Sequence, residues 1–282
     1  MIAMKTLLTS FLLILFSNTA TVQQPEPVYR GMIDPTGTTI ESRFQTPPGY
    51  ERISDEEGSF ARWLRDLPLK AHGSTVKYYN GSTKSSRGVY AAVIDKAIGS
   101  GDLHQCADAV IRLRAEYLWE TEQYDRLHFK LTNGWNMEYT EWMKGKRFKI
   151  KGNTTWWENG AARANTYEDL WGYLTVLFNY AGTYSLNKEL KAIDTQEMQI
   201  GDMFIRGGFP GHVMIIVDMA VNPQTGQKVF MLAQSYMPAQ ELQVVINPNN
   251  SSLGVWYPAD FGETLYTPEW TFKRSEFKRF EN

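Results

Sequence analysis

The chain has 282 residues, 43% of them hydrophobic, and its 29 Lys and Arg nearly balance its 31 Asp and Glu. Because the two signs are interleaved, the composition excludes the concentrated positive charge that binds nucleic acid or an anionic membrane surface. The length is sufficient for one large domain with an ample core, and we expect a single domain over residues 42–282.

The first twenty residues have the pattern of a secretory signal peptide. Lys5 precedes an apolar run over residues 7–16, and the small residues that end at Ala20 are typical of a cleavage site. A membrane-spanning helix needs about 20 apolar residues, which is twice this run. We therefore expect that residues 1–20 are removed and that residues 21–41, rich in Pro, Thr and Gly, form a flexible linker. The mature protein is expected to be exported to the periplasm or outside the cell, without stable membrane insertion.

Hydrophobic periodicity predicts the main elements of the domain. They are a short amphipathic helix over 59–67, extended segments over 75–79 and 89–94, a helix over 105–121, strands within the Trp-rich stretch 129–157, a helix over 167–180, and strands over 213–220 and 228–234. The last two strands are joined by a turn and predict a β-hairpin. Such a hairpin brings His212, at the start of one strand, near Gln234 and Ser235 at the end of the other.

Cys106 is the only cysteine of the chain, so it cannot form an internal disulfide. It begins an apolar helix face that continues through Val110, Leu113 and Tyr117. The free N–H groups and the dipole at a helix start favour a thiolate, which is the nucleophilic form of cysteine. A free cysteine is also among the most frequently buried residues, so a packing role stays open beside a catalytic one.

The order of these features resembles the NlpC-type, papain-like peptidases and amidases of bacterial cell walls. The resemblance is carried by Cys106 at a helix start, Gly-Asp at 201–202, Gly-His-Val at 211–213, and Gln234 on the next strand. It implies an α+β, papain-like fold in which a helix with Cys at its N-terminus packs on an antiparallel sheet. It also implies that Cys106 is the nucleophile, that His212 is its base, that Gln234 orients the imidazole, and that no cofactor is needed.

Two further observations qualify this resemblance. The Cys and His are separated by 106 residues, more than is typical, so we expect an insertion around residues 129–165. Over about residues 42–280 the chain also resembles a family of secreted bacterial proteins that is described only as a domain of unknown function. The segments 105–118 and 232–240 carry that second resemblance.

The chemistry expected of such a site is hydrolysis of an amide bond in a peptide or muropeptide. The thiolate attacks the carbonyl, the imidazolium protonates the leaving amine, and the N–H of Cys106 with a donor such as Gln105 holds the oxyanion.

Two other classes of function stay open. The domain could bind a peptide or glycan without catalysis, or it could be a carbohydrate-active protein that uses carboxylates such as Glu138, Glu141 and Glu158 among its tryptophans. A metal pair of His104 and Cys106 is less favoured, because no further ligands stand at zinc-site spacing.

Overall fold

The computed structural model describes residues 31–85 and 88–281. The expected signal peptide and residues 21–30 of the expected linker lie outside the described residues. No helix in the described part of the chain is both long enough and apolar enough to span a membrane.

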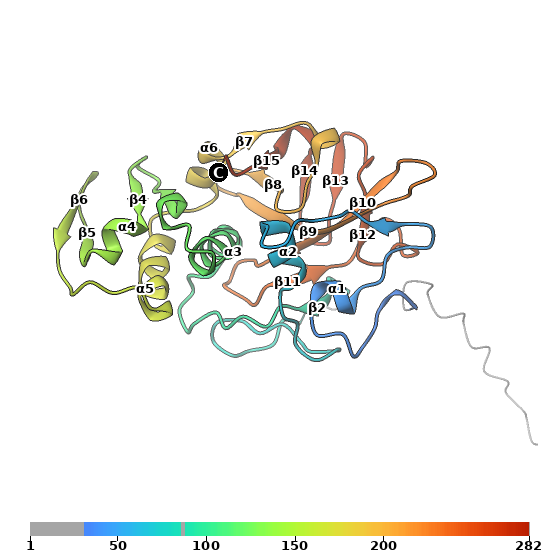
Figure 1. Cartoon of the computed structure of the whole chain (residues 1–282), viewed down its shortest axis with the longest axis horizontal. Coiled ribbons are helices and arrows are strands. Elements are labelled where there is room, and N and C mark those ends of the chain that lie inside the picture. Colours follow the sequence, from blue (N-terminus) through green and yellow to red (C-terminus); the bar gives the residue numbers. More distant parts are fainter. Residues whose placement is uncertain (1–30, 86–87, 282) are drawn as a thin grey trace, which may run out of the picture.

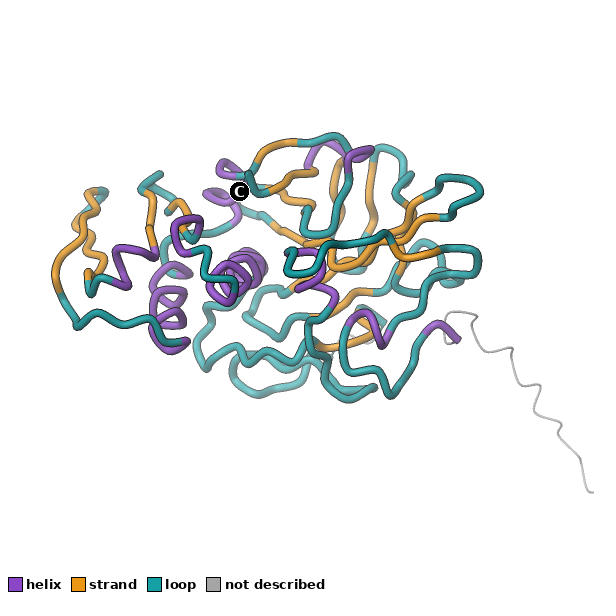
Figure 2. The backbone as a smooth tube through the Cα atoms, viewed as in Figure 1, coloured by secondary structure: helices purple, strands orange, loops and turns teal. Residues whose placement is uncertain are grey.

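The described chain is organised around a nine-stranded sheet, whose strand pairs are antiparallel. Its main path runs β2-β11-β10-β9-β8-β15-β7, while β1 pairs with β9 and β12 pairs with β10. Figures 1 and 2 show these strands crossing one half of the molecule. Their bounds are β1 Glu51–Arg52, β2 Tyr90–Val93, β7 Lys191–Ala192, β8 Met203–Arg206, β9 His212–Val221, β10 Lys228–Gln234, β11 Gln243–Val245, β12 Trp256–Pro258 and β15 Phe277–Arg279.

Strand β9 is the centre of this sheet and is buried from its first residue almost to its last. Side chains of a strand alternate between the two faces, so Val213 and Ile215 point one way and Met214 and Ile216 the other. The first pair belongs to a core shared with the helices, and the second pair to a core shared with the hairpin of β13 (Thr264–Tyr266) and β14 (Thr271–Lys273). Both faces are therefore covered, which explains the continuous apolar sequence of β9.

Helix α3 (Cys106–Glu120) is the longest helix of the described chain and is buried on nearly all sides. It packs against β9 on one side and against α5 (Tyr167–Phe178) on the other (Figure 1). Two short helices, α1 (Ile40–Arg43) and α2 (Phe60–Arg65), also contact β9. Helix α6 (Thr183–Glu189) lies beside α3 and β8.

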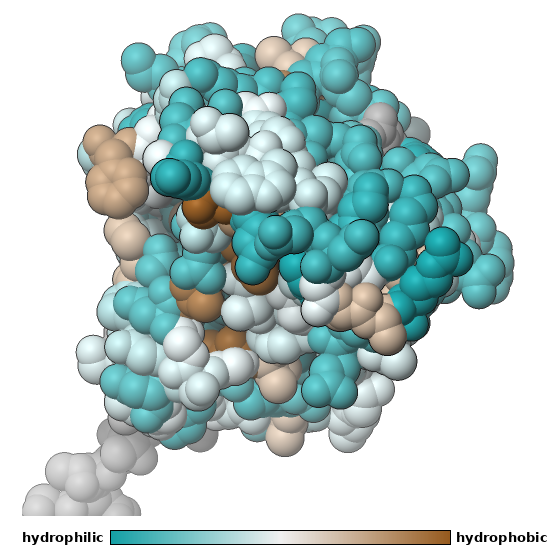
Figure 3. Space-filling view, turned by 90° about the vertical axis from the view of Figure 1, so that its left-hand side faces the viewer, coloured by the Kyte–Doolittle hydropathy of each residue, from teal (hydrophilic) through white to brown (hydrophobic). Residues whose placement is uncertain are grey.

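The region between α3 and α5 forms two small hairpins and a short helix at one end of the molecule (Figure 1). They are β3 (His128–Lys130) with β4 (Asn136–Glu138), α4 (Tyr139–Met143), and β5 (Lys146–Lys151) with β6 (Thr154–Asn159). Seen from this end, the surface is mainly hydrophilic, with small hydrophobic areas between polar side chains (Figure 3).

The expected α+β, papain-like (NlpC-type) fold is wrong. The described chain is mostly antiparallel sheet with few helices, and strands from both ends of the domain extend the hairpin of β9 and β10 to nine strands. The additional strands have two to four residues each, too few to show the alternation by which a strand is recognised in a sequence. The sequence does predict an extended segment at β2 and a strand at β8, but it does not show that they and the other short strands join the hairpin of β9 and β10 in one sheet.

A buried ion-pair network ties α2 to the sheet. The Asp218 carboxylate on β9 is fully buried and accepts hydrogen bonds from Nε of Arg65 at 2.6 Å and Nε of Arg52 at 2.8 Å. Arg65 is only 2% exposed and also donates to Asp55 and to the carbonyl oxygen of Met219. Every charge in this network has a partner, as burial of ions requires.

Candidate active site

His212 and Gln234 are in direct contact. They occupy the first residue of β9 and the last residue of β10, and Nε2 of His212 lies 2.7 Å from Oε1 of Gln234. Both residues are 1% exposed. Because they stand on adjacent paired strands, the backbone ladder fixes the distance between their side chains.

The Gln234 amide is oriented by a third residue, Glu269, which precedes β14. Nε2 of Gln234 donates to Oε2 of Glu269 at 2.7 Å, so the amide oxygen must face the imidazole. That oxygen can only accept, and Nε2 of His212 must therefore carry the proton. The other ring nitrogen, Nδ1, is left with a free lone pair, which is the form needed by a general base.

Glu269 is itself held by Lys84, whose ammonium lies 2.6 Å from the same carboxylate oxygen. Lys84 is 4% exposed and also donates to Oε1 of Gln240 at 3.0 Å. Burial lowers the pKa of Lys84, while the ion pair with Glu269 raises it. The two acceptors compensate the buried charge and fix the carboxylate that orients Gln234.

Aromatic rings enclose the imidazole. The ring centroid of His212 lies 4.7 Å from that of Tyr236 and 5.2 Å from that of Trp270. Burial lowers the pKa of His212 to about 4, and the nearby Lys84 acts in the same direction, whereas the hydrogen bond to Gln234 raises it. The imidazole is consequently neutral at pH 7.

Cys106 begins α3 and lines a groove of about 300 Å³. The groove lies between the start of α3, the start of α6 and the loop before β9, where Gly211 is also part of the lining. Helix α3 packs against β9, and the backbone N–H of Val213, the residue after His212, lowers the pKa of the Cys106 thiol. The thiol belongs to the core on the helix-covered face of the sheet, whereas the imidazole packs against Trp270 and Phe272 and does not line the groove.

The pKa of the Cys106 thiol is raised, whereas the sequence led us to expect a lowered pKa and a thiolate. Burial raises its pKa to about 11, and the neighbouring Asp108 carboxyl adds to this, while the backbone N–H groups of Val213 and Ala107 oppose it. Cys106 is therefore a neutral thiol and not a thiolate. Its burial away from water raises the thiol pKa more than the dipole and free N–H groups at the start of α3 lower it. The resting pair is a neutral thiol and a neutral imidazole.

Three other residues near Cys106 have defined positions. Gln105 lines the groove, but its side-chain amide donates to Asp102 at 3.2 Å. Ser235 is fully buried and donates to backbone carbonyl oxygens, one of them that of His104, and not to the imidazole. The ring of His104 is buried with both nitrogens unpaired among the described residues, and burial lowers its pKa to about 3.

The carboxylates considered for carbohydrate chemistry have partners of their own, and Glu138 accepts a hydrogen bond from Asn136 at 3.4 Å. Both oxygens of Glu141 are bound by Lys144 and Lys146, whereas Glu158 faces Lys149 at 3.8 Å. Among the described residues no three His, Cys, Asp or Glu side chains gather as a metal site would require.

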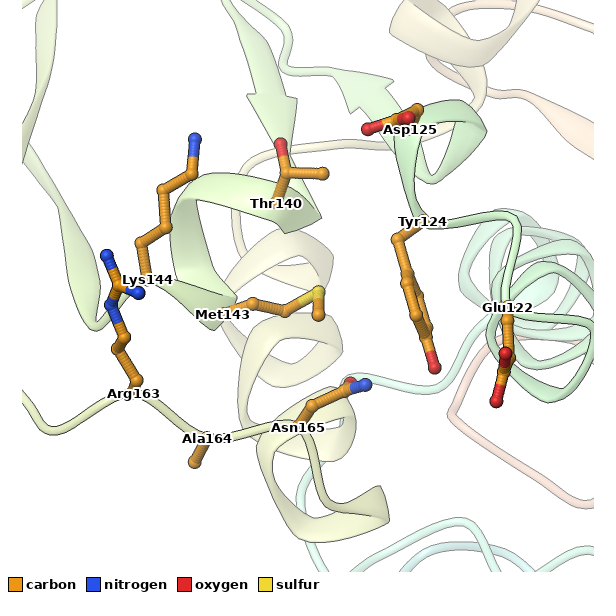
Figure 4. Close-up of a pocket in the computed structure, with 9 residues that line it drawn as sticks. All are labelled: Glu122, Tyr124, Asp125, Thr140, Met143, Lys144, Arg163, Ala164 and Asn165. Carbon is orange, nitrogen blue, oxygen red and sulfur yellow. The ribbon is translucent and has the colours of Figure 1, made fainter.

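A separate depression of about 520 Å³ lies beside α4 and contains neither Cys106 nor His212. Figure 4 shows Tyr124 and Met143 within it, with Glu122 on one side and Arg163 on the other. Its lining holds no thiol or imidazole, so a thiol-based reaction cannot take place there.

Reasoning from the sequence missed Glu269, Lys84 and Tyr236. No local signal could have identified Glu269 or Lys84, because the two lie 185 residues apart and meet only through the fold. Tyr236 follows Gln234 by two residues and could have been considered as an aromatic cover of the hairpin end.

Gln234→Ala is expected to slow any reaction that uses the imidazole by about tenfold to a hundredfold, because an unrestrained ring samples both tautomers and other orientations. NMR of ¹⁵N-labelled His212 should change from the Nε2–H tautomer to a mixture. The matched control is Gln227→Ala in the turn of the same hairpin. An unchanged His212 spectrum in Gln234→Ala would contradict the orienting role.

Comparison with known proteins gives one match. Residues 40–279 match the profile of a protein family described as Domain of unknown function (4846). No curated protein and no solved structure matches the chain. Nothing in these comparisons supports the resemblance to NlpC-type peptidases, whereas the resemblance to a family of unknown function is confirmed. The match covers most of the sequence, and the chain belongs to this family, Domain of unknown function (4846).

Proposed function

We propose that this protein is an exported cysteine hydrolase, an amidase or endopeptidase, that cleaves amide bonds of peptides or muropeptides. Cys106 is the nucleophile, His212 the base and Gln234 the residue that orients the base. One observation carries the proposal: the hydrogen-bonded series Glu269–Gln234–His212 leaves Nδ1 as the unprotonated nitrogen, and Gly211, the residue before His212, lines the same groove as Cys106. Export is proposed from the leader-like residues 1–20.

The proposed reaction starts from the neutral pair. As the sulfur forms a bond to the substrate carbonyl carbon, the thiol proton passes to Nδ1 of His212, and an oxyanion and an imidazolium result. The oxyanion collapses, the C–N bond breaks, and the imidazolium returns the proton to the leaving amine. A water molecule, deprotonated by the same nitrogen, then hydrolyses the thioester. Proton transfer requires the sulfur and Nδ1 to lie within roughly 5 Å, with closure to hydrogen-bond distance during the reaction.

The groove supplies polar groups suited to a peptide. The backbone N–H groups in the first turn of α3 have no partner within the helix and can hold the oxyanion. Oδ1 of Asp108 is buried in the groove wall without a hydrogen-bond partner among the described residues. An N–H group of a bound peptide would satisfy this oxygen, which would otherwise remain desolvated. Burial raises the pKa of Asp108 to about 8.

A binding module without catalysis is the second candidate. It is favoured by the burial of Cys106. The residue is only 8% exposed, and burial raises the pKa of its thiol to about 11. Such a module would hold a peptide in the same groove, and the thiol would only pack. The two candidates differ in whether Cys106 accepts an acyl group.

Acyl transfer from p-nitrophenyl acetate to Cys106 tests the proposal. We expect the acylation rate to be level from about pH 5 to pH 9 and to fall tenfold per pH unit below about pH 4. The neutral imidazole is the acting base, so protonation of His212 through its pKa of about 4 removes it. Release of nitrophenol gives the rate, and intact-mass measurement confirms where the acetyl group is.

His212→Ala is the matched variant for this test. Without the base, acylation should be at least a hundredfold slower at pH 7 and should rise with pH toward the pKa of the thiol near 11. Equal rates and equal pH profiles in both proteins, or no acylation of the folded wild-type protein, would refute the hydrolase and leave the binding module.

A further inference from the structure

Arg114 is a buried cation without an acidic partner in the described chain. It lies on α3 and is 6% exposed, yet it forms no hydrogen bond or ion pair within residues 31–85 and 88–281. Its Nη2 atom is buried and unpaired. Burial and the nearby Arg126 together lower the pKa of Arg114 to about 10, which still leaves the group charged at pH 7. Arg112, two residues earlier, pairs with Glu116 and shows the usual arrangement of a buried arginine.

Aromatic rings occupy the surroundings of the Arg114 guanidinium. Its Cζ atom lies 5.1 Å from the ring centroid of Phe60 and 5.5 Å from those of Tyr117 and Phe280. Cation–π contacts of this kind involve the faces of the rings and offset part of the cost of burial. They cannot accept the strong in-plane hydrogen bonds that guanidinium N–H groups make with an oxyanion.

Arg114 lines a pocket of about 190 Å³ that is separate from the groove of Cys106. Arg126, His128 and Lys130 contribute to the same lining, and Nδ1 of His128 is likewise buried without a partner in the described chain. The remaining lining residues are Leu118, Phe129, Glu189, Phe280 and Glu281. The lining therefore combines two residues with unpaired buried nitrogen atoms, Arg114 and His128, and has more basic than acidic side chains.

We propose that this pocket binds the carboxylate group of a small organic acid or of a peptide C-terminus, with Arg114 as its principal partner. The lining carries three basic side chains, those of Arg114, Arg126 and Lys130, and two acidic ones, those of Glu189 and Glu281. Glu189 is already engaged by the backbone N–H of Lys130. A carboxylate matches one guanidinium through two parallel hydrogen bonds, and the apolar walls suit a small hydrocarbon body.

The site does not depend on the proposed hydrolase. Arg114 stands eight residues after Cys106 on the same helix, which is about 12 Å at 1.5 Å per residue. Helix α6 runs between the groove of Cys106 and the pocket of Arg114. Thr183 at its start lines the groove, and Glu189 at its end lines the pocket. Binding can be measured whether or not Cys106 is catalytic.

Calorimetric titration of the full mature protein tests the inference at constant ionic strength. The ligands are sodium propionate, N-acetyl-Ala-Ala with a free C-terminus, the same dipeptide with an amidated C-terminus, and inorganic phosphate. We expect saturable binding of at least one free carboxylate, no binding of the amide, and weaker binding of phosphate. Preference for propionate identifies a free acid as the ligand class, and preference for the dipeptide identifies a peptide terminus.

Arg114→Gln should weaken carboxylate binding at least tenfold, and Arg114→Lys should retain part of it because the charge remains but the paired donors do not. Should Arg114→Gln fail to fold by circular dichroism, Arg126→Gln at the same pocket should weaken binding severalfold. Lys188→Met is the matched control, since it removes an exposed cation beside Glu189 that does not line the pocket. Tighter binding of phosphate than of any carboxylate, equal binding of the amidated dipeptide, or unchanged affinity in the Arg114 variants would overturn the proposal.

Discussion

Cys106→Ala is expected to reduce hydrolysis of a peptide or muropeptide amide by about 10⁴-fold or more, with the fold intact. The substitution removes the atom that would form the thioester, and groups that act together lose almost all of their effect when one is removed. The change corresponds to roughly 5 kcal/mol of transition-state stabilisation. Release of new amine ends from a panel of peptides and cell-wall fragments measures it.

The control for this result is Met237→Ala. Met237 lines the same groove and is half exposed, but it carries no group that could take part in the reaction. A change of only a few fold is expected, from altered substrate contact. If both variants keep the wild-type rate on a cleaved substrate, Cys106 is not the nucleophile and the hydrolysis has another origin.

Asp218→Ala should destabilise the fold by about 3–5 kcal/mol, because it leaves the guanidinium of Arg65 buried without its main partner. For a domain of this size the loss corresponds to a fall in Tm of roughly 10 °C. Arg52 loses the same carboxylate but is more exposed and can turn to water. Urea unfolding followed by tryptophan fluorescence measures the difference in free energy of unfolding.

Asp66→Ala is the matched comparison for Asp218→Ala. Asp66, the residue that follows α2, pairs with Arg62 of that helix, but its side chain is 56% exposed. Such an ion pair contributes about 0–1 kcal/mol. If the two alanine variants were equally stable, burial would not be the reason for the importance of Asp218.

The elements with strong periodicity could be predicted from the sequence, and the layout of the sheet could not. The helix expected over 105–121 and the hairpin strands expected over 213–220 and 228–234 correspond to α3, β9 and β10. Strands such as β1 and β7 have two residues each and exist only because a neighbouring strand offers hydrogen-bonding groups. A pattern in the sequence cannot reveal an element whose cause lies in tertiary pairing.

Part of the candidate site could be predicted from the sequence. The hairpin prediction places His212 beside Gln234, since strand pairing fixes that neighbourhood, and the structure has the two side chains 2.7 Å apart. The ionisation of the site could not be predicted in the same way. A helix start suggested a lowered thiol pKa, but the pKa of Cys106 depends on how much water reaches it, which only the packed structure defines.

The burial of Cys106 also affects whether two copies of the protein can be joined by a disulfide. A disulfide requires the two Cα atoms to come within roughly 7 Å of each other, with the sulfurs in bonding contact. The sulfur of Cys106 lies at the wall of a groove and is almost covered by its own chain. Two folded copies therefore cannot be crosslinked through this residue, and the single thiol can persist in an oxidising compartment without acting as a dimerisation point.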